Sequence, residues 1–204
     1  MNKSSCPATE RNRKPIVDQL IQVLRGSKKV LEIGSGTGEH AVWFAPRLSW
    51  LTWIPSDLPR QQEVIKQWLQ TSPQTNLHPP IVLDVNGLWP QCGHDAIFTA
   101  NTAHIIPWPG VKKMISFGAS TLPVDGIFCL YGPVIFEHVS LANSNREFDR
   151  QLRSTDPEKG LRKFEELNRV ARDANMCLVE NTPLPANNNL LVWRKAASYD
   201  CPKG

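Results

Sequence analysis

A short segment near the amino terminus combines three glycines with two glutamates, which is a pattern that could bind a ligand. It reads Leu31-Glu32-Ile33-Gly34-Ser35-Gly36-Thr37-Gly38-Glu39-His40. Closely spaced glycines let a backbone turn sharply and approach a bound molecule. We therefore interpret the segment as a binding loop, whose candidate ligand contacts are Glu32, Gly34, Ser35, Gly36 and Gly38.

The spacing and charge of this loop argue against two common phosphate-binding loops. A dinucleotide fingerprint needs its third glycine three places after Gly36, where this chain has Glu39, and the Gly-Lys-Ser/Thr of a P-loop is absent. Glu32 and Glu39 would also repel a pyrophosphate. S-Adenosylmethionine carries a sulfonium and an ammonium but no phosphate, and backbone amides can bind its carboxylate. The loop therefore predicts S-adenosylmethionine as the cofactor.

Polar side chains also follow the next three predicted strands. Asp57 lies 21 residues after Gly36, where a carboxylate can accept hydrogen bonds from both ribose hydroxyls, and Asp84 is placed to accept one from the adenine amino group. The alternative for Asp57 is an N-cap of the helix that follows it. Strand ends of this kind line the ligand crevice of an open α/β sheet. The predicted cofactor contacts here are Asp57, Leu58, Asp84, Val85 and Asn101.

The elements that position these residues alternate between strand and helix. Short apolar runs predict strands at 29–33, 50–54, 81–83, 96–100, 125–131, 176–180 and 190–194. Helical periodicity predicts helices at 15–26, 39–47, 60–70 and 110–122, with two more patterns inside 144–175. We expect Pro15 to begin the first helix and Pro55 to stop the second strand.

This alternation predicts one α/β domain over residues 1–204, with a mostly parallel seven-stranded sheet and helices on both faces. The last two strands are joined by a connection too short for a parallel crossover, so we expect a C-terminal antiparallel hairpin. Such a sheet is typical of Rossmann-like class I methyltransferases. We expect an N-terminal arm at 1–14, a core at 15–195 and a tail at 196–204.

Composition limits the partners and the compartment. A formal charge of +4, from 23 basic and 19 acidic residues, includes no long run of one sign and does not favour a nucleic-acid partner. Five scattered cysteines without a C-x-x-C pair predict neither a disulfide framework nor a zinc site, and we expect no other metal. No apolar run is long enough for a membrane span, and the polar first residues lack a leader, so we expect a cytoplasmic protein.

Methyl transfer makes particular demands on a site. It is an in-line displacement with a neutral thioether as leaving group, and alignment alone can lower the barrier by roughly 7 to 11 kcal/mol. His104 follows Asn101 and has a reference pKa near neutrality, so it is the candidate general base, although it could instead donate a hydrogen bond or shape the pocket. Ala103 and His104 do not continue an Asn/Asp-Pro-Pro-Tyr/Phe signature, which argues against adenine-N6 or glutamine methylation. Trp108 and Tyr131 are candidate walls of an acceptor pocket, with core packing as the alternative.

Several motifs recur together in one known family: Arg11-Asn12, the 31–40 loop, Pro55-Ser56-Asp57, Asn101-Thr102-Ala103-His104-Ile105, Tyr131-Gly132-Pro133, Ser144-Asn145, Phe148-Asp149 and Pro185-Ala186-Asn187-Asn188. Over residues 9–195 the chain resembles the domain-of-unknown-function 938 family, which includes animal methyltransferase-like protein 26. The resemblance implies S-adenosylmethionine dependence without naming the acceptor. It also implies that Arg11 and Asn12 bind the cofactor carboxylate and that Ser144 and Asn145 contact the substrate. Residues 134–143 depart from the family pattern, where we expect the acceptor pocket.

Together these patterns favour a small-molecule methyltransferase, because the cofactor constellation is present and no recognition domain is appended. One alternative is a protein or RNA methyltransferase, which the basic cluster Arg11, Arg13 and Lys14 permits. A second alternative is a non-catalytic module that keeps the cofactor fold for regulation or assembly.

Overall fold

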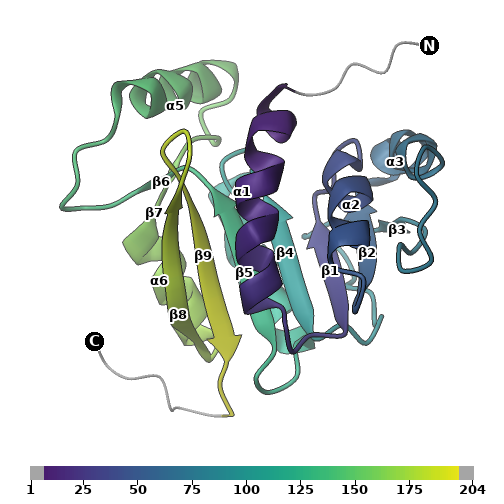
Figure 1. Ribbon diagram of the computed structural model, residues 1–204. Helices are drawn as coiled ribbons and strands as arrows, with labels where there is room; N and C mark the ends of the chain where they lie inside the picture. The colour runs from purple at the N-terminus through teal and green to yellow at the C-terminus, as the bar shows by residue number, and fades with distance from the viewer. Residues whose placement is uncertain (1–6, 198–204) are drawn as a thin grey trace.

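The computed structural model describes residues 7–197, and a seven-stranded sheet forms its centre (Figure 1). The strand order is β3-β2-β1-β4-β5-β9-β8. All pairs are parallel except β5 with β9 and β9 with β8, so the predicted sheet and its antiparallel hairpin are confirmed. The strands are β1 (Lys29–Ile33), β2 (Thr52–Asp57), β3 (Ile81–Val82), β4 (Ala96–Ala100), β5 (Ile127–Gly132), β8 (Met176–Leu184) and β9 (Asn188–Lys195).

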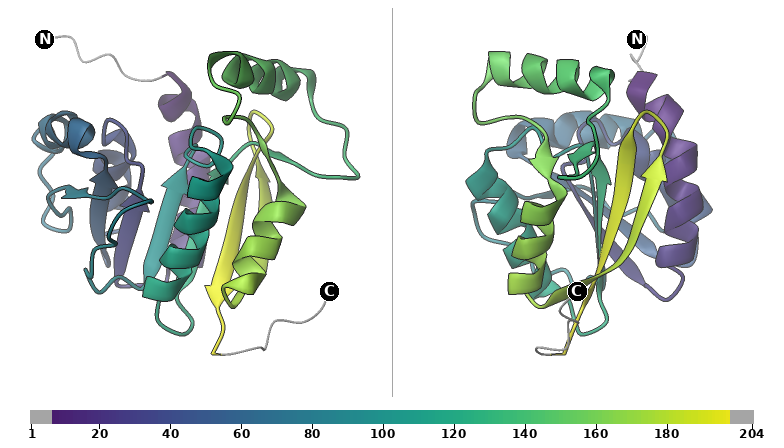
Figure 2. Two further views of the ribbon diagram at one scale, coloured as in Figure 1. Left: turned by 180° about the vertical axis from the view of Figure 1, so that it is seen from behind. Right: turned by 90° about the vertical axis from the view of Figure 1, so that its left-hand side faces the viewer.

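Helices cover both faces of this sheet, as predicted, and Figure 2 shows the layers edge-on. On one face Ile16 and Leu20 pack with Phe44 against Trp53 and Phe98 of the strands. On the other face the fourth and sixth helices pack against alternate strand residues. The helices are α1 (Pro7–Val23), α2 (Glu39–Phe44) with the 3-10 turn η1 (Ala45–Arg47), η2 (Pro59–Gln61), α3 (Gln62–Leu69), α4 (Trp108–Thr121), α5 (Asn143–Thr155) and α6 (Phe164–Asp173).

The central strands are apolar on both faces because both faces are covered. In β5, Phe128 and Leu130 join the cluster under α4 and α6, whereas Cys129 and Tyr131 join the cluster under α1 and α2. Side chains alternate along a strand, so a strand buried on both sides reads as a continuous apolar run. This explains why the central strands could be predicted closely, with β1 and β4 matching residue for residue.

Pro55 lies inside β2, so the prediction that it ends the strand is wrong. It pairs in register with Glu32 of β1. Along β2, the backbone groups of Trp53 and Asp57 bond toward the β3 side. Backbone groups of alternate residues point to the same side of a strand, so the nitrogen of Pro55 also faces the β3 side. No strand pairs with β2 at this point, because Pro55 lies between the isolated bridge at Trp53 and the residues that pair with β3, which begins at Ile81. Its missing N–H therefore breaks no ladder bond.

Pro15 lies inside α1, so the prediction that it begins this helix is also wrong. Residues 7–14, which were expected in an arm, are helical, and residues 1–6 lie outside the described part of the chain. A proline removes one bond to the carbonyl four residues earlier, here that of Arg11. Arg11 is exposed, so solvent can satisfy that carbonyl, and the buried stripe of Ile16 and Leu20 continues below it.

The hairpin is longer than predicted, since β8 runs to Leu184 rather than to residue 180. The sheet ends at β8, so alternate residues there, including Asn181 and Pro183, are exposed. An edge strand tolerates polar residues and proline, whose missing N–H faces solvent. Two residues at the turn, Ala186 and Asn187, have φ of 61° and 56°. The Pro- and Asn-rich segment is therefore mostly strand and tight turn.

A small second sheet was not predicted, whereas α5 and α6 correspond to the two helical patterns expected inside 144–175. β6 (Val134–Ile135) pairs in parallel with β7 (Arg162–Lys163), and α5 stands above the carboxyl ends of the strands, outside the two helical layers (Figures 1 and 2). Cys177 in β8 is disulfide-bonded, although the cysteine pattern suggested no disulfide framework. Among the described helices, none combines the length and the apolar character needed to cross a bilayer.

Candidate functional site

The glycine loop joins β1 to α2, and its three glycines adopt left-handed backbone conformations. Gly34, Gly36 and Gly38 have φ of 72°, 60° and 88°. A Cβ added at Gly34 would lie 2.5 Å from the Thr102 hydroxyl, and one at Gly38 would lie 3.1 Å from Cγ2 of Ile65. A Cβ at Gly36 would meet no atom within 4 Å. The loop is thus packed tightly at its two ends and faces open space at its centre.

Glu32 and Ser35 hold this loop against the sheet. Oε2 of Glu32 accepts hydrogen bonds from the Ser35 hydroxyl at 2.8 Å and from the Trp53 indole at 3.0 Å. Ser35 also exchanges two 3.0 Å bonds with the backbone of Ser56, at the end of β2. Burial raises the pKa of the Glu32 carboxyl to about 7, although both hydrogen bonds to it act in the opposite direction. These contacts lie within the protein and position the loop.

Asp57 connects the loop to the end of β2. Its Oδ2 accepts a hydrogen bond from the Gly36 N–H at 2.8 Å, and its Oδ1 accepts one from the Leu58 N–H at 2.7 Å. The residue at the N-cap of η2 is Leu58, and no side chain caps that turn. The alternative of Asp57 as a helix cap is therefore wrong. Each carboxylate oxygen can accept a further bond, and Asp57 is only half-buried, so it remains able to receive ligand donors.

The structure brings the ends of β3 and β4 to the same edge as the loop. Asp84 is exposed and accepts the N–H of Asn86 at 2.9 Å, in a local turn, while Val85 is buried. Asn101 has φ of 59°, a conformation that asparagine tolerates, and its N–H donates to Tyr131 O at 2.9 Å. The strand-end arrangement expected from the sequence is therefore present in the fold.

His104 is buried, and its pKa differs from the near-neutral value assumed from the sequence. Only 4% of its surface is exposed, and its ring meets Phe148 of α5 edge-on, with centroids 5.2 Å apart. Burial, assisted by the charge of Arg162, lowers its pKa to about 4. A Cβ at Gly132 would lie 3.7 Å from Nδ1 of His104 and 3.6 Å from Oδ1 of Asn101. The two polar side chains thus both lie next to Gly132, at the end of β5.

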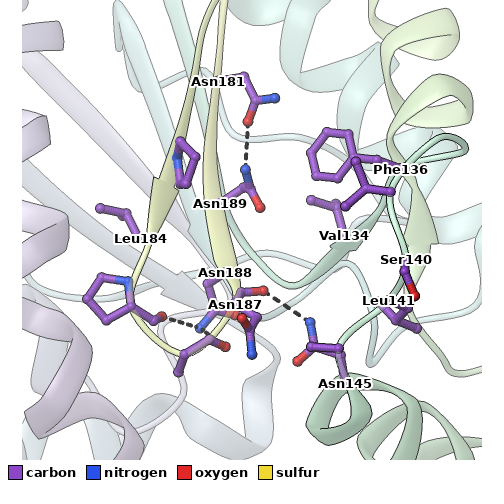
Figure 3. A pocket seen from close by; sticks show the side chains of 15 residues that line it. Val134, Phe136, Ser140, Leu141, Asn145, Asn181, Leu184, Asn187, Asn188 and Asn189 are labelled. Carbon is purple, nitrogen blue, oxygen red and sulfur yellow. Dashed lines mark hydrogen bonds between the residues drawn. The ribbon is translucent and has the colours of Figure 1, made fainter.

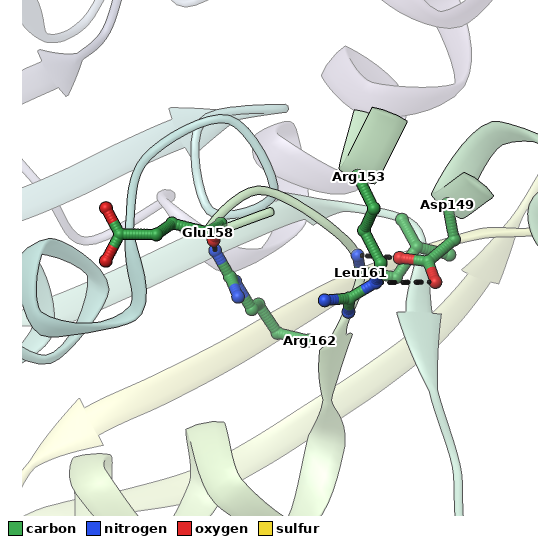
Figure 4. Close-up of polar contacts among 5 residues, drawn as sticks. All are labelled: Asp149, Arg153, Glu158, Leu161 and Arg162. Atoms are coloured by element: carbon green, nitrogen blue, oxygen red, sulfur yellow. Dashed lines mark hydrogen bonds and ion pairs between the residues drawn. The ribbon is translucent and has the colours of Figure 1, made fainter. Parts of the chain in front are cut away.

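Arg162 fixes the segment that carries His104, and sequence reasoning missed it. Its guanidinium donates to Ala103 O at 2.9 Å and to Ile106 O at 2.6 Å. It also donates to Glu158 O at 2.8 Å, the bond drawn in Figure 4. Desolvation lowers the pKa of this buried arginine. All three acceptors are backbone carbonyls, which leave no side-chain signal in the sequence.

A second network, beside Arg162, ties α5 to the chain before β7. Oδ2 of Asp149 accepts from Nε of Arg153 at 3.0 Å, and its Oδ1 accepts the N–H of Leu161 at 2.7 Å (Figure 4). Gly160 has φ of 131°, a backbone conformation that favours glycine, and a Cβ there would lie 2.7 Å from that same oxygen. These bonds hold α5 over the segment that contains His104.

On the opposite face of the sheet, α1 brings a polar side chain to the first turn of α2. Oδ1 of Asn12 lies 3.1 Å from Nε2 of His40, whose pKa burial lowers to about 4. Tyr131 is 2% exposed, and its hydroxyl has no hydrogen-bond partner among the described residues. Burial raises the pKa of that hydroxyl, and the nearby amides of Asn12 and Asn188 partly oppose the rise. Arg11, the other residue predicted at the cofactor carboxylate, is exposed.

A pocket of about 580 Å³ opens between the hairpin tip and the start of α5 (Figure 3). Asn145 is among its lining residues, and its Nδ2 donates to Asn187 O at 3.0 Å. Ser144 lies beside it and accepts from Nδ2 of Asn187 at 3.2 Å. The lining includes neither Ser144 nor the other two predicted substrate contacts: Tyr131 faces α1, and Trp108 is half-buried against the core near Arg162. Part of the lining comes from residues 134–142, in the segment where the acceptor pocket was expected.

The family model described as "Protein of unknown function (DUF938)" matches residues 3–195. The chain belongs to the DUF938 family. Solved methyltransferases share the fold of this DUF938 protein at low sequence identity. An O-methyltransferase family protein from Burkholderia thailandensis has a TM-score of 0.80 and 15% identity, over 94% of this chain and 58% of its own.

Two further solved structures carry ligands. Human N-acetylserotonin methyltransferase in complex with SAM has a TM-score of 0.77 and 13% identity, over 93% of the DUF938 chain and 53% of its own. An O-methyltransferase family 2 protein from Planctomyces limnophilus, in complex with apigenin, has a TM-score of 0.73 and 14% identity, over 90% and 62%. The DUF938 chain thus spans between half and two thirds of the length of these proteins, and the likeness shows the fold.

Proposed function

We propose that this chain is an S-adenosylmethionine-dependent methyltransferase that transfers the methyl group in line to a small-molecule acceptor. The observation that carries the proposal is the link between Gly36 and Asp57, because it joins an open, left-handed glycine loop to a strand-end carboxylate. The pair places an acceptor carboxylate beside the open space at the centre of the loop, where a ligand hydroxyl could donate to it. The fold shared with solved methyltransferases supports it, as do motifs that favour kinship with animal methyltransferase-like protein 26.

The residues present fit this cofactor. Gly36 leaves open space that any side chain would fill, and no lysine stands in the loop to bind a phosphate. We propose that Asp57 holds the ribose hydroxyls, that Asp84 and Val85 hold the adenine, and that Asn12 and Arg11 hold the carboxylate. When bound, S-adenosylmethionine supplies an electrophilic methyl group on a sulfonium. The chain contributes position, since the tight packing at Gly34 and Gly38 fixes the loop before any ligand arrives.

His104 remains our candidate base, in a modified role. With its pKa near 4 it is neutral at physiological pH and therefore able to accept a proton, but it is a weak base. An acceptor whose hydroxyl is already acidic needs little help of this kind. Alignment by the pocket and the carboxyl edge of the sheet then contributes more to the rate than proton transfer does.

The test is a transfer assay with tritiated S-adenosylmethionine in a cell extract. After incubation, the label is measured separately in the small-molecule, protein and RNA fractions, with wild-type chain and with a Gly36→Val variant. We expect label in the small-molecule fraction with the wild type alone. Label found only in protein or RNA would show that the acceptor is a macromolecule and not a small molecule. No transfer by a folded protein that binds the cofactor would favour a non-catalytic module.

A further inference from the structure

The pocket between the hairpin tip and α5 is lined without a single ionisable side chain. Its aliphatic, aromatic and proline residues are interrupted only by one serine and five asparagines. A pocket that must hold an ionised group normally supplies an opposite charge, because a buried unpaired charge is costly. Glu180, on the same strand as Asn181, joins the other face of the hairpin, where its charge acts on buried Cys129. The lining residues are Val134, Phe136, Val139, Ser140, Leu141, Ala142, Asn145, Asn181, Pro183, Leu184, Pro185, Ala186, Asn187, Asn188 and Asn189.

Glu137, His138 and Arg146 adjoin lining residues in the sequence, but none of them is part of the lining. Arg146 follows Asn145 on α5, and its guanidinium donates to Leu141 O at 2.9 Å and to the Ser140 hydroxyl at 3.0 Å. These bonds hold the loop before α5 and use donors that an anionic ligand would otherwise need. The pocket therefore offers a ligand apolar surface and neutral polar groups.

A pair of carboxamides faces the apolar wall of this pocket. Nδ2 of Asn189 donates to Oδ1 of Asn181 at 2.8 Å, across the two strands of the hairpin. Figure 3 shows this pair opposite Val134 and Phe136. Two amides bonded to each other leave one N–H₂ and one carbonyl for a third group, whichever way each amide is turned. A hydroxyl, which both donates and accepts, is complementary to such a pair.

We propose that the methyl acceptor is an uncharged, largely apolar molecule bearing a hydroxyl group, and that Asn181 and Asn189 recognise a neutral polar group on it. This inference rests on the proposed function, and it narrows the substrate to a chemical class. The volume of about 580 Å³ suits a molecule of two or three fused or linked rings. The aromatic ring of Phe136, already packed on Phe164 with centroids 5.2 Å apart, gives a flat ligand a firm wall.

The test compares two probes that share one framework and differ in charge. Binding of 4′-hydroxyflavone and of flavone-4′-carboxylate is measured by calorimetry, at a pH where the hydroxyl is neutral and the carboxyl is ionised. We expect the hydroxyl compound to bind at least about tenfold more tightly than the carboxylate. Wild-type protein that binds the carboxylate equally well or better, or that binds neither probe, overturns the proposal.

An engineered charge provides a second arm of the experiment. Asn181 is exposed, so Asn181→Lys should fold, and it should raise the affinity for the carboxylate about ten- to a hundredfold through a charge-assisted bond. Gln91→Lys makes the same amide-to-ammonium change at an exposed site between β3 and β4, outside the pocket lining, and should leave both affinities unchanged. Equal effects of the two variants would show that the probes bind elsewhere and would overturn the proposal.

Separate titration with S-adenosylhomocysteine distinguishes this inference from the proposed function. If S-adenosylhomocysteine does not bind but the preference for the hydroxyflavone is retained, the proposed methyltransferase function is contradicted and the pocket for a neutral ligand is still supported. If S-adenosylhomocysteine binds but the two flavones bind equally well, only the proposed substrate class is contradicted.

Discussion

The Gly36 N–H donates a 2.8 Å hydrogen bond to Oδ2 of Asp57, so the carboxylate that ends β2 also fixes the centre of the glycine loop. Asp57 therefore has two effects that can be separated by measurement. Its removal should loosen the loop and should also take away a ligand acceptor. The two half-buried bonds from the Gly36 and Leu58 N–H groups contribute to the stability of the fold, whereas bonds from ligand hydroxyls would contribute to the affinity.

Asp57→Ala should weaken the affinity for S-adenosylmethionine about ten- to several hundredfold, since charge-assisted bonds contribute about 1.5 to 3 kcal/mol each. The affinity of Asp57→Asn, which keeps one acceptor oxygen, should lie between that of Asp57→Ala and that of the wild type. Calorimetry gives the affinities, and the melting temperature without ligand gives the stability of each variant. Unchanged affinity with lowered stability would show that Asp57 serves only the loop.

Gly36→Val should abolish cofactor binding, because its side chain would enter the open space at the loop centre and a β-branched residue does not accept φ of 60°. Gly36→Asn separates the two causes, since asparagine tolerates that conformation but still fills the space. Both variants should lose at least about a hundredfold in affinity. Gly26→Ala is the matched control, because a Cβ there also meets no atom within 4 Å and its φ is not positive. Near-normal affinity in Gly36→Asn would mean that the ligand does not approach this residue.

The raised pKa of Glu32 predicts a pH-dependent stability. With a folded-state pKa of about 7 against a usual 4.5, the folded protein retains a proton that the unfolded chain releases. The resulting stabilisation is full below the unfolded value and is lost as the pH rises through about 7. It amounts to roughly 2 to 3 kcal/mol between about pH 5 and pH 8. Urea unfolding of wild type and Glu32→Gln at both pH values should show this difference, and parallel curves would contradict the burial of the carboxyl.

His104 titrates in the opposite sense. Its folded-state pKa is lowered from 6.5 to about 4, so the unfolded chain binds a proton first, and stability is lost as the pH falls between these values. His104→Gln should remove this part of the acid sensitivity, whereas His40 contributes its own part in the same direction. As a base, His104 should give a rate that stays flat from about pH 5 to pH 8. A step near 6.5 that disappears in His104→Gln would contradict its burial.

The elements that carry the proposed cofactor site could be predicted because their signals are local. The glycine loop, β1, β4 and the position of Asp57 depend on nearby residues and on the ordinary geometry of parallel strands. The errors at Pro15 and Pro55 arose because proline was taken as a stop without knowing what its missing N–H would face. Pro55 breaks no ladder bond, and the one helix bond that Pro15 removes involves the carbonyl of exposed Arg11, which solvent can satisfy.

The pocket proposed for the acceptor could not be predicted from local sequence patterns. It joins residues 134–145 to residues 181–189, and only the hairpin between β8 and β9 and the position of α5 bring these segments together. The pKa of His104 depends on Phe148 and Arg162, which come from α5 and β7 and left no local signal near the histidine. The pKa of His104 was therefore misjudged from the sequence because segments distant in the chain bury the side chain.

Calorimetric titration of the whole chain with S-adenosylhomocysteine, with the oxidised nicotinamide dinucleotide and with ATP in parallel, tests the central proposal most directly. The loop lacks a phosphate-binding pattern and ends in Gly38 and Glu39. We predict binding of S-adenosylhomocysteine with a dissociation constant in the micromolar range or below, at about one site per chain, and no measurable binding of either phosphate-bearing ligand. Absence of S-adenosylhomocysteine binding to folded protein, or equally tight binding of the dinucleotide, would contradict the assignment of this site.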